Sequence, residues 1–248
     1  MGKLLSVLLF MLFIPLSYSA SCTDVETCIP EKAFKYRDLI YSEIETYFPE
    51  IPIYAYIPSL IEHESCISLT HRRCWEPTSR LKTEREEGAG LSMVTRAYNS
   101  DGSIRFDTLT TLRRKYIEEL KEASWDTIYQ RPDVQIRILV LLSRDNYKAL
   151  YSVTDPMERL YMADSAYNGG LSGVFRDRRA CSLAPNCDPQ KWFNNVEKYC
   201  TKSKKILYGN RNACDINRYH VKDIFKTRLS KYENIYFSQL PWPKGQGL

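Results

Sequence analysis

Apolar residues recur at helical spacing along most of the chain, and residues 31–47 are the first stretch to show it. Its apolar members are Phe34, Leu39, Ile40, Ile44 and Tyr47. Side chains three and four positions apart share one face of a helix, so this pattern predicts a helix over 31–47. Pro49 and Pro52 end it, and Pro58 suits the first turn of the next helix.

The second half of the chain carries the strongest helix signals. Helical spacing resumes with Leu109, Leu112, Tyr116 and Leu120. Residues 136–142 are apolar on nearly every side, which indicates a central buried helix. Asp155, Pro156 and Glu158 form a capped helix start, and Asn168-Gly169-Gly170 is a natural stop. We therefore predict further helices over 155–168, 188–206 and 215–236.

Residues 76–107 interrupt the helical pattern. They are polar, contain glycine and include the turn signal Asn99-Ser100-Asp101-Gly102, so we expect loops or a small β-hairpin. The chain has no internal repeat, low-complexity linker or clear domain boundary. The sequence therefore predicts a mainly α fold of the α+β kind, with one domain over residues 20–248 that includes N- and C-terminal extensions.

Residues 1–19 have the composition of a signal peptide. Lys3 precedes an apolar run over residues 4–16, and Ser17-Tyr18-Ser19-Ala20 supplies small residues for cleavage after Ser19. The run is shorter than the ~20 residues that span a bilayer, and Pro15 interrupts it. We predict a secreted or periplasmic protein without a stable membrane span after cleavage. A retained anchor is the alternative.

The chain contains eight cysteines, an even number that predicts a disulfide framework in an oxidising compartment. Close neighbours in sequence suggest the pairs 22–28, 66–74, 181–187 and 200–214, although eight cysteines allow 105 pairings in principle. A zinc site is the competing interpretation. No C-x-x-C motif occurs, and none of the three histidines has ligand spacing from another, so we predict no metal.

The charge is modestly positive. The formal net charge is +5, and removal of Lys3 with the signal would leave +4. This charge could favour an anionic polymer such as a cell wall, but it is too small and too dispersed to indicate nucleic-acid binding.

One acid lies on an apolar helix face. Four residues share that face at i, i+3, i+4 and i+7: Ile57, Leu60, Ile61 and Glu64. Desolvation raises the pKa of a carboxyl group and keeps a proton available near neutral pH, as a general acid requires. The alternative is that Glu64 ends the helix at the surface or pairs with Arg72 or Arg73. Glu62 lies off the apolar stripe, and we expect it to be solvated.

Three segments, in this order, resemble motifs of the lysozyme-like lytic transglycosylases. Glu64-Ser65 resembles the Glu-Ser signature, whose glutamate is the sole catalytic acid and base. Residues 88–93, Gly-Ala-Gly-Leu-Ser-Met, resemble the glycine-rich segment that lines the sugar groove. Residues 166–170, Ala-Tyr-Asn-Gly-Gly, are similar to the motif whose tyrosine hydrogen-bonds the catalytic glutamate. The resemblance covers about residues 55–175 and implies a lysozyme-like fold.

The resemblance also implies a reaction on the glycan strands of peptidoglycan. Glu64 would protonate the oxygen of the β-1,4 bond between N-acetylmuramic acid and N-acetylglucosamine. It would then accept the proton of the muramic C6 hydroxyl, which closes a 1,6-anhydro ring without a metal or cofactor. The substrate-binding residues would be Ser65, Gly88, Gly90, Leu91, Met93, Tyr167 and Asn168.

The sequence departs from the family pattern in two places. Residues 92–94 supply no glutamine at the end of the glycine segment, so a groove hydrogen bond would be absent. The interval between Glu64 and Tyr167 is longer than is typical, which implies an inserted helix.

Other readings of the site remain open. A lysozyme-type hydrolase usually needs a second carboxylate, which Glu84, Glu86 or Glu87 could supply. That acidic loop could instead be solvated and neutralise Arg80 and Arg85. A non-catalytic peptidoglycan-binding protein on the same scaffold is the alternative from another class. His63-Glu64-Ser65-Cys66-Ile67 is not a zinc-protease H-E-x-x-H motif.

Overall fold

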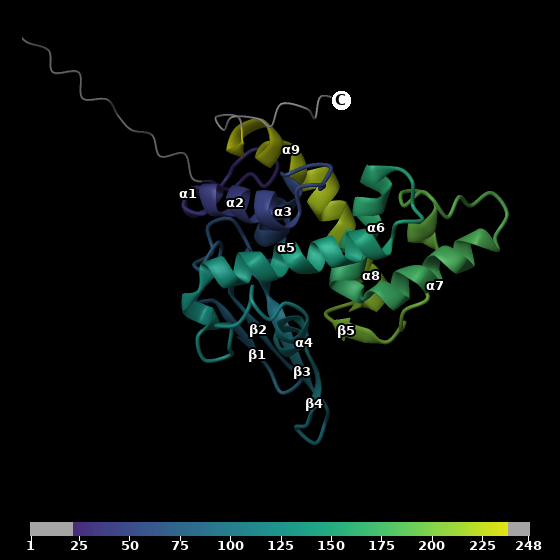
Figure 1. Ribbon diagram of the computed structural model, residues 1–248. Helices are drawn as coiled ribbons and strands as arrows, with labels where there is room; N and C mark the ends of the chain where they lie inside the picture. Colours follow the sequence, from purple (N-terminus) through teal and green to yellow (C-terminus); the bar gives the residue numbers. More distant parts are fainter. Residues whose placement is uncertain (1–21, 238–248) are drawn as a thin grey trace, which may run out of the picture.

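Helix α5 (Pro132–Ala149) crosses the molecule between a group of helices and a small antiparallel sheet (Figure 1). The computed structural model describes residues 22–237, so the predicted signal peptide at 1–19 lies outside the described residues. The other α-helices are α1 (Glu31–Phe34), α2 (Arg37–Tyr47), α3 (Tyr56–Ser65), α4 (Thr108–Lys115), α6 (Pro156–Gly169), α7 (Leu171–Ser182), α8 (Ala213–Lys222) and α9 (Leu229–Lys231). Short 3-10 helices are η1 (Gly90–Ser92), η2 (Ile128–Gln130) and η3 (Val196–Lys198), and π-helical turns are η4 (Asp223–Arg228) and η5 (Tyr232–Tyr236).

The sheet forms in the stretch that interrupts the helical pattern. Its antiparallel order is β1-β2-β3-β4. The strands are β1 (Arg80–Lys82), β2 (Glu86–Ala89), β3 (Val94–Tyr98) and β4 (Ile104–Asp107), and a separate pair is β5 (Ile206–Tyr208) with β6 (Arg211–Asn212). The mainly helical fold with a small β region is therefore confirmed, and the expected hairpin extends to four strands.

Helix α5 lies between two hydrophobic cores, so apolar residues on opposite sides of it are buried. Ile136, Leu139 and Val140 are buried against the helical core. Ile138 and Leu141 are buried in a second core that packs beneath the sheet. The apolar run at 136–142 thus predicted a buried helix correctly.

Four disulfides join the eight cysteines, and all four predicted pairs are confirmed. They are Cys22–Cys28, Cys66–Cys74, Cys181–Cys187 and Cys200–Cys214. Such a framework is typical of proteins in oxidising compartments. Across residues 22–237, no helix has both the length and the apolar character needed to cross a bilayer.

The predicted helix over 188–206 is wrong. The Asp-Pro signal makes only a local turn, in which Asp188 accepts a hydrogen bond from the Gln190 N–H. Asn194 then takes a left-handed backbone conformation with φ of 62°, which stops any helix, and only the short η3 follows. The helix expected over 215–236 exists. It begins two residues earlier, at Ala213, where Asn212 and Asp215 form a capping box.

Candidate active site

Glu64 lies in the last turn of α3, and its side chain is 19% exposed. The predicted apolar face of this helix is buried in the main core, which fixes the direction in which Glu64 points. Helix α3 ends at Ser65 because the chain turns into the loop closed by Cys66–Cys74. The Ser65 hydroxyl accepts a hydrogen bond from the Trp75 N–H at 3.2 Å, so it holds this loop against the helix.

The partner of Glu64 is a histidine that the sequence interpretation missed. The distance between His220 Nε2 and Glu64 Oε1 is 2.9 Å, and His220 Nδ1 lies 2.9 Å from Asp164 Oδ2. The Tyr56 hydroxyl donates to the other oxygen of Asp164 at 3.1 Å. Neither Arg72 nor Arg73 pairs with Glu64 among the ion pairs of the described residues. Helices α3, α6 and α8 therefore meet in a buried hydrogen-bonded chain.

His220 is charged in this chain. Burial opposes its protonation, but the carboxylates of Asp164 and Glu64 outweigh burial and raise the pKa of His220 to about 10. A cationic imidazole donates from both ring nitrogens, which suits two carboxylate neighbours. His220 therefore donates to Glu64 and to Asp164 at neutral pH.

Tyr167 does not make the hydrogen bond that the family resemblance implied. Its hydroxyl donates to the Ser92 carbonyl at 2.7 Å, because His220 already occupies the position beside Glu64. The Tyr167 ring stacks on His220 with 6.3 Å between ring centroids. Burial and the nearby charges of Glu64 and Asp164 raise the pKa of the Tyr167 phenol well above its usual range. Tyr167 thus stays a donor and ties α6 to the glycine segment.

The glycine segment is shaped by a glutamine from another element. Gln135 of α5 accepts a hydrogen bond from the Leu91 N–H at 2.7 Å. Its amide also donates to the carbonyls of Pro77 and Ile128. Gly90 has a φ of +62°, and a Cβ there would lie 2.0 Å from Gln135 Oε1. The segment itself has no glutamine, and Gln135 serves the backbone rather than the groove.

A groove of about 620 Å³ runs between the sheet and the α6–α7 junction. Four of the residues singled out from the sequence line it: Glu86, Met93, Tyr167 and Asn168. The Met93 side chain covers Gly88, and Gly90 and Leu91 are buried behind the groove wall. Glu64 is not among the residues that line the groove. Tyr167 connects the two, because it lines the groove and its ring stacks on His220.

The two acids of β2 have opposite environments because successive strand residues face opposite ways. Glu87 is 2% exposed and pairs with Arg80 and Arg96. Burial works against its charge, but hydrogen bonds from Arg96, Tyr129 and Arg80 lower the pKa of Glu87 to about 2. Glu87 is therefore a permanent, enclosed carboxylate, and only Glu86 faces the groove.

Glu62 is a clear correction to the sequence interpretation, which expected it to be solvated. Its side chain is fully buried and accepts hydrogen bonds from Arg228, Lys231 and Tyr232. These partners come from the C-terminal helical turns, which pack beneath α3. The acid next to the apolar stripe thus binds the C-terminal segment to the helix that carries Glu64.

The missed residues lie beyond the motif-bearing segment or have weak local signals. His220 is 156 residues from Glu64, so no spacing rule connects them. Asp164 precedes Tyr167 by one helical turn, and this shared face was the one signal that could have drawn attention to it.

Comparison of the chain with protein-family models, curated proteins and solved structures finds no match. The resemblance to lytic transglycosylases therefore rests on the three sequence motifs alone.

Proposed function

We propose that this protein is a lytic transglycosylase that cleaves the β-1,4 bond between N-acetylmuramic acid and N-acetylglucosamine in peptidoglycan. One observation carries the proposal. Glu64 is held through one carboxylate oxygen by a buried histidine, and the ring that stacks on this histidine is Tyr167, which lines a groove together with Asn168 of the same motif and Met93 of another. Within the described residues, Glu64 Oε1 is the only oxygen of this carboxyl with a hydrogen bond, which leaves Oε2 for a substrate.

The reaction needs one carboxyl group. Glu64 acts as the acid when Oε2 carries a proton: it gives this proton to the glycosidic oxygen, and the bond between that oxygen and C1 of the muramic sugar breaks. The C6 hydroxyl oxygen of the same sugar then bonds to C1, and its proton returns to Glu64. The products are a strand ending in 1,6-anhydromuramic acid and a strand with a free glucosamine hydroxyl. The carboxyl ends the cycle in its starting state, without water or a metal.

A hydrolase is the second candidate, and Glu86 is the observation that favours it. Glu86 lines the groove, where a second carboxylate could direct a water molecule towards C1. Glu87 is unsuited to this role because two arginines enclose it.

The setting that we propose is outside the cytoplasm, reached through the predicted signal at 1–19. The four disulfides support an oxidising compartment. Peptidoglycan strands would be encountered there without further transport.

The test is mass spectrometry of the soluble products released from purified sacculi. The wild type is compared with Glu64→Gln and with Glu118→Gln, a control whose side chain is 84% exposed. We expect 1,6-anhydro muropeptides from the wild type and the control, and none from Glu64→Gln. Reducing-end products would establish hydrolysis instead, and their loss in Glu86→Gln would identify the second carboxylate. Binding to sacculi without any products would replace both activities with a binding function.

A further inference from the structure

We propose that His220, held by Asp164, is a positioning residue that fixes Glu64 for proton transfer and faces it with a positive charge when it becomes a carboxylate. The inference rests on the proposed function and adds to it a role for helix α8, which lies outside the motif-bearing segment.

The His220 ring has a single available orientation. Each ring nitrogen lies 2.9 Å from a carboxylate oxygen, Glu64 on one side and Asp164 on the other. The ring of Tyr167 stacks on it, and the ring of His63 meets it edge-on with 4.4 Å between centroids. His220 is 2% exposed and Asp164 is fully buried, so water does not compete for the hydrogen bond between these two residues.

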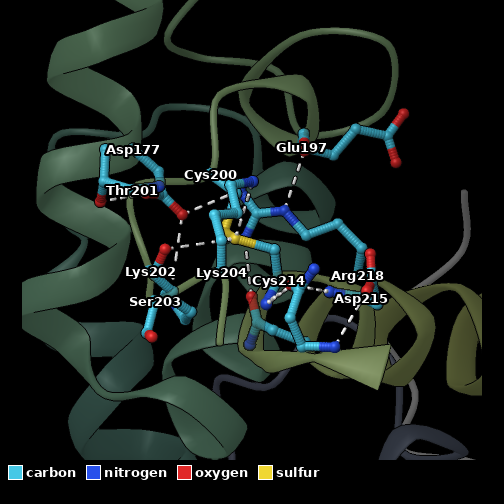
Figure 2. The surroundings of a disulfide bond; sticks show 12 residues. Asp177, Glu197, Cys200, Thr201, Lys202, Ser203, Lys204, Cys214, Asp215 and Arg218 are labelled. Atoms are coloured by element: carbon cyan, nitrogen blue, oxygen red, sulfur yellow. Dashed lines mark hydrogen bonds and ion pairs between the residues drawn. A yellow bond between two sulfur atoms is a disulfide. The ribbon is translucent and has the colours of Figure 1, made fainter. Parts of the chain in front are cut away.

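Two sets of contacts hold helix α8, which carries His220, in place. One turn before His220, the Asn217 amide donates to the Ser165 carbonyl and to Asn168 Oδ1, which binds α8 to the Ala-Tyr-Asn motif. Figure 2 shows the second anchor, in which Cys200–Cys214 closes the start of α8 and Arg218 donates to the buried Asp177. The first anchor fixes α8 relative to α6, which carries Asp164, and the second fixes it relative to α7 and the loop after η3.

In the proposed reaction His220 keeps both of its protons and acts only as a hydrogen-bond donor. His220 donates to Glu64 Oε1 throughout, while Glu64 Oε2 loses a proton to the glycosidic oxygen and regains one from the C6 hydroxyl. Between those steps Glu64 is an anion opposite a cation, which is the most favourable partner for it in a buried site. A neutral His220 would place a nitrogen lone pair against one of the two carboxylates.

Several titratable groups bear on the charge of His220. Glu64 and His63 face it from α3, and Asp164 and Tyr167 face it from α6. Behind them, Tyr56 donates to Asp164, and Asp223 of η4 binds His63. The negative groups that contact His220 directly are the carboxylates of Glu64 and Asp164. Asp164→Asn should therefore weaken its protonation without removing its hydrogen-bond partner.

The first experiment is nitrogen NMR of the full-length protein after ¹⁵N-histidine labelling, which needs no variant to fold. We expect both ring nitrogens of His220 to carry protons at pH 7.5, and Asp164→Asn to lower the pH at which one is lost. A His220 ring with a single proton at pH 7.5 would overturn the inference, whatever the enzyme activity proves to be.

The second experiment measures kcat and KM on sacculi for His220→Gln, with His71→Gln as the matched control in the loop closed by Cys66–Cys74. Glutamine can donate to Glu64 but carries no charge. We expect kcat to fall roughly 100-fold with KM nearly unchanged, and the control to retain full activity. Unchanged kcat in folded His220→Gln, alongside a wild type whose activity depends on Glu64, would overturn the inference and leave the proposed function standing. A wild type without activity would overturn both.

Discussion

His220 Nε2 lies 2.9 Å from Glu64 Oε1, although 156 positions separate the two residues in the sequence. The contact joins the helix that carries the proposed catalytic acid to a helix near the C-terminal end of the described chain. The same region is bound to α3 a second time through the buried Glu62. The C-terminal helices are therefore bound at two points to the helix that carries Glu64.

The disulfide at the start of α8 should matter for activity as well as for stability. We expect Cys200→Ser/Cys214→Ser to lose about 3 kcal/mol of unfolding free energy and to lower kcat even where the protein is fully folded. The matched control, Cys181→Ser/Cys187→Ser, removes a bridge at the end of α7 and should lower stability while keeping kcat. Denaturant unfolding and muropeptide release measure the two effects. Equal kcat losses in both double variants would contradict the proposed role of α8.

Glu62 should be one of the most sensitive positions in the protein. In Glu62→Gln, the fully buried Lys231 loses its carboxylate partner, whereas Arg228 keeps its ion pair with Asp223. An uncompensated buried charge typically costs about 3–5 kcal/mol. Urea unfolding with intact disulfides is the measurement, with the exposed Glu118→Gln as control. A loss below about 1 kcal/mol would show that the buried network is not held by charge.

Local signals account for what the sequence predicted correctly. Asp155 caps α6 by accepting from the N–H groups of Met157 and Glu158, and such a signal is readable within a few residues. The disulfide partners are near neighbours in sequence. The apolar run in α5 is continuous enough to indicate burial without knowledge of its two cores.

Long-range contacts account for what the sequence could not predict. The segment after Asp188 has a helix-start signal. The Trp192 N–H nevertheless donates to Glu158 of α6, and the backbone of Asn194 adopts a left-handed conformation, so no long helix forms. The apolar stripe identified Glu64 as a candidate, yet it gave no information on His220. Local spacing also misjudged Glu62, because its cationic partners lie more than 160 residues away.

Glu87 should make the free energy of unfolding depend on pH in the acid range. Its pKa of about 2 in the folded protein is below the ordinary value of 4.5, so its contribution is present above pH 4.5 and is lost as the pH falls towards 2. That contribution is about 3 kcal/mol. The gap in unfolding free energy between wild type and Glu87→Gln should therefore narrow by about 3 kcal/mol between pH 6 and 2. Chemical unfolding across this range tests it, and a gap independent of pH would contradict it.

Gly90 and Gly102 offer a matched pair that separates backbone strain from crowding. Both have positive φ, +62° and +82°, so alanine at either position costs about 1 kcal/mol in backbone strain. At Gly102 a new Cβ meets no atom within 4 Å, whereas at Gly90 it lies 2.0 Å from Gln135 Oε1. Gln135 cannot withdraw without releasing its hydrogen bond to Leu91. We therefore expect Gly90→Ala to cost about 2–4 kcal/mol and Gly102→Ala about 1 kcal/mol in denaturant unfolding. Equal costs would mean that the glycine segment can move away from α5, and that Gln135 does not fix its conformation.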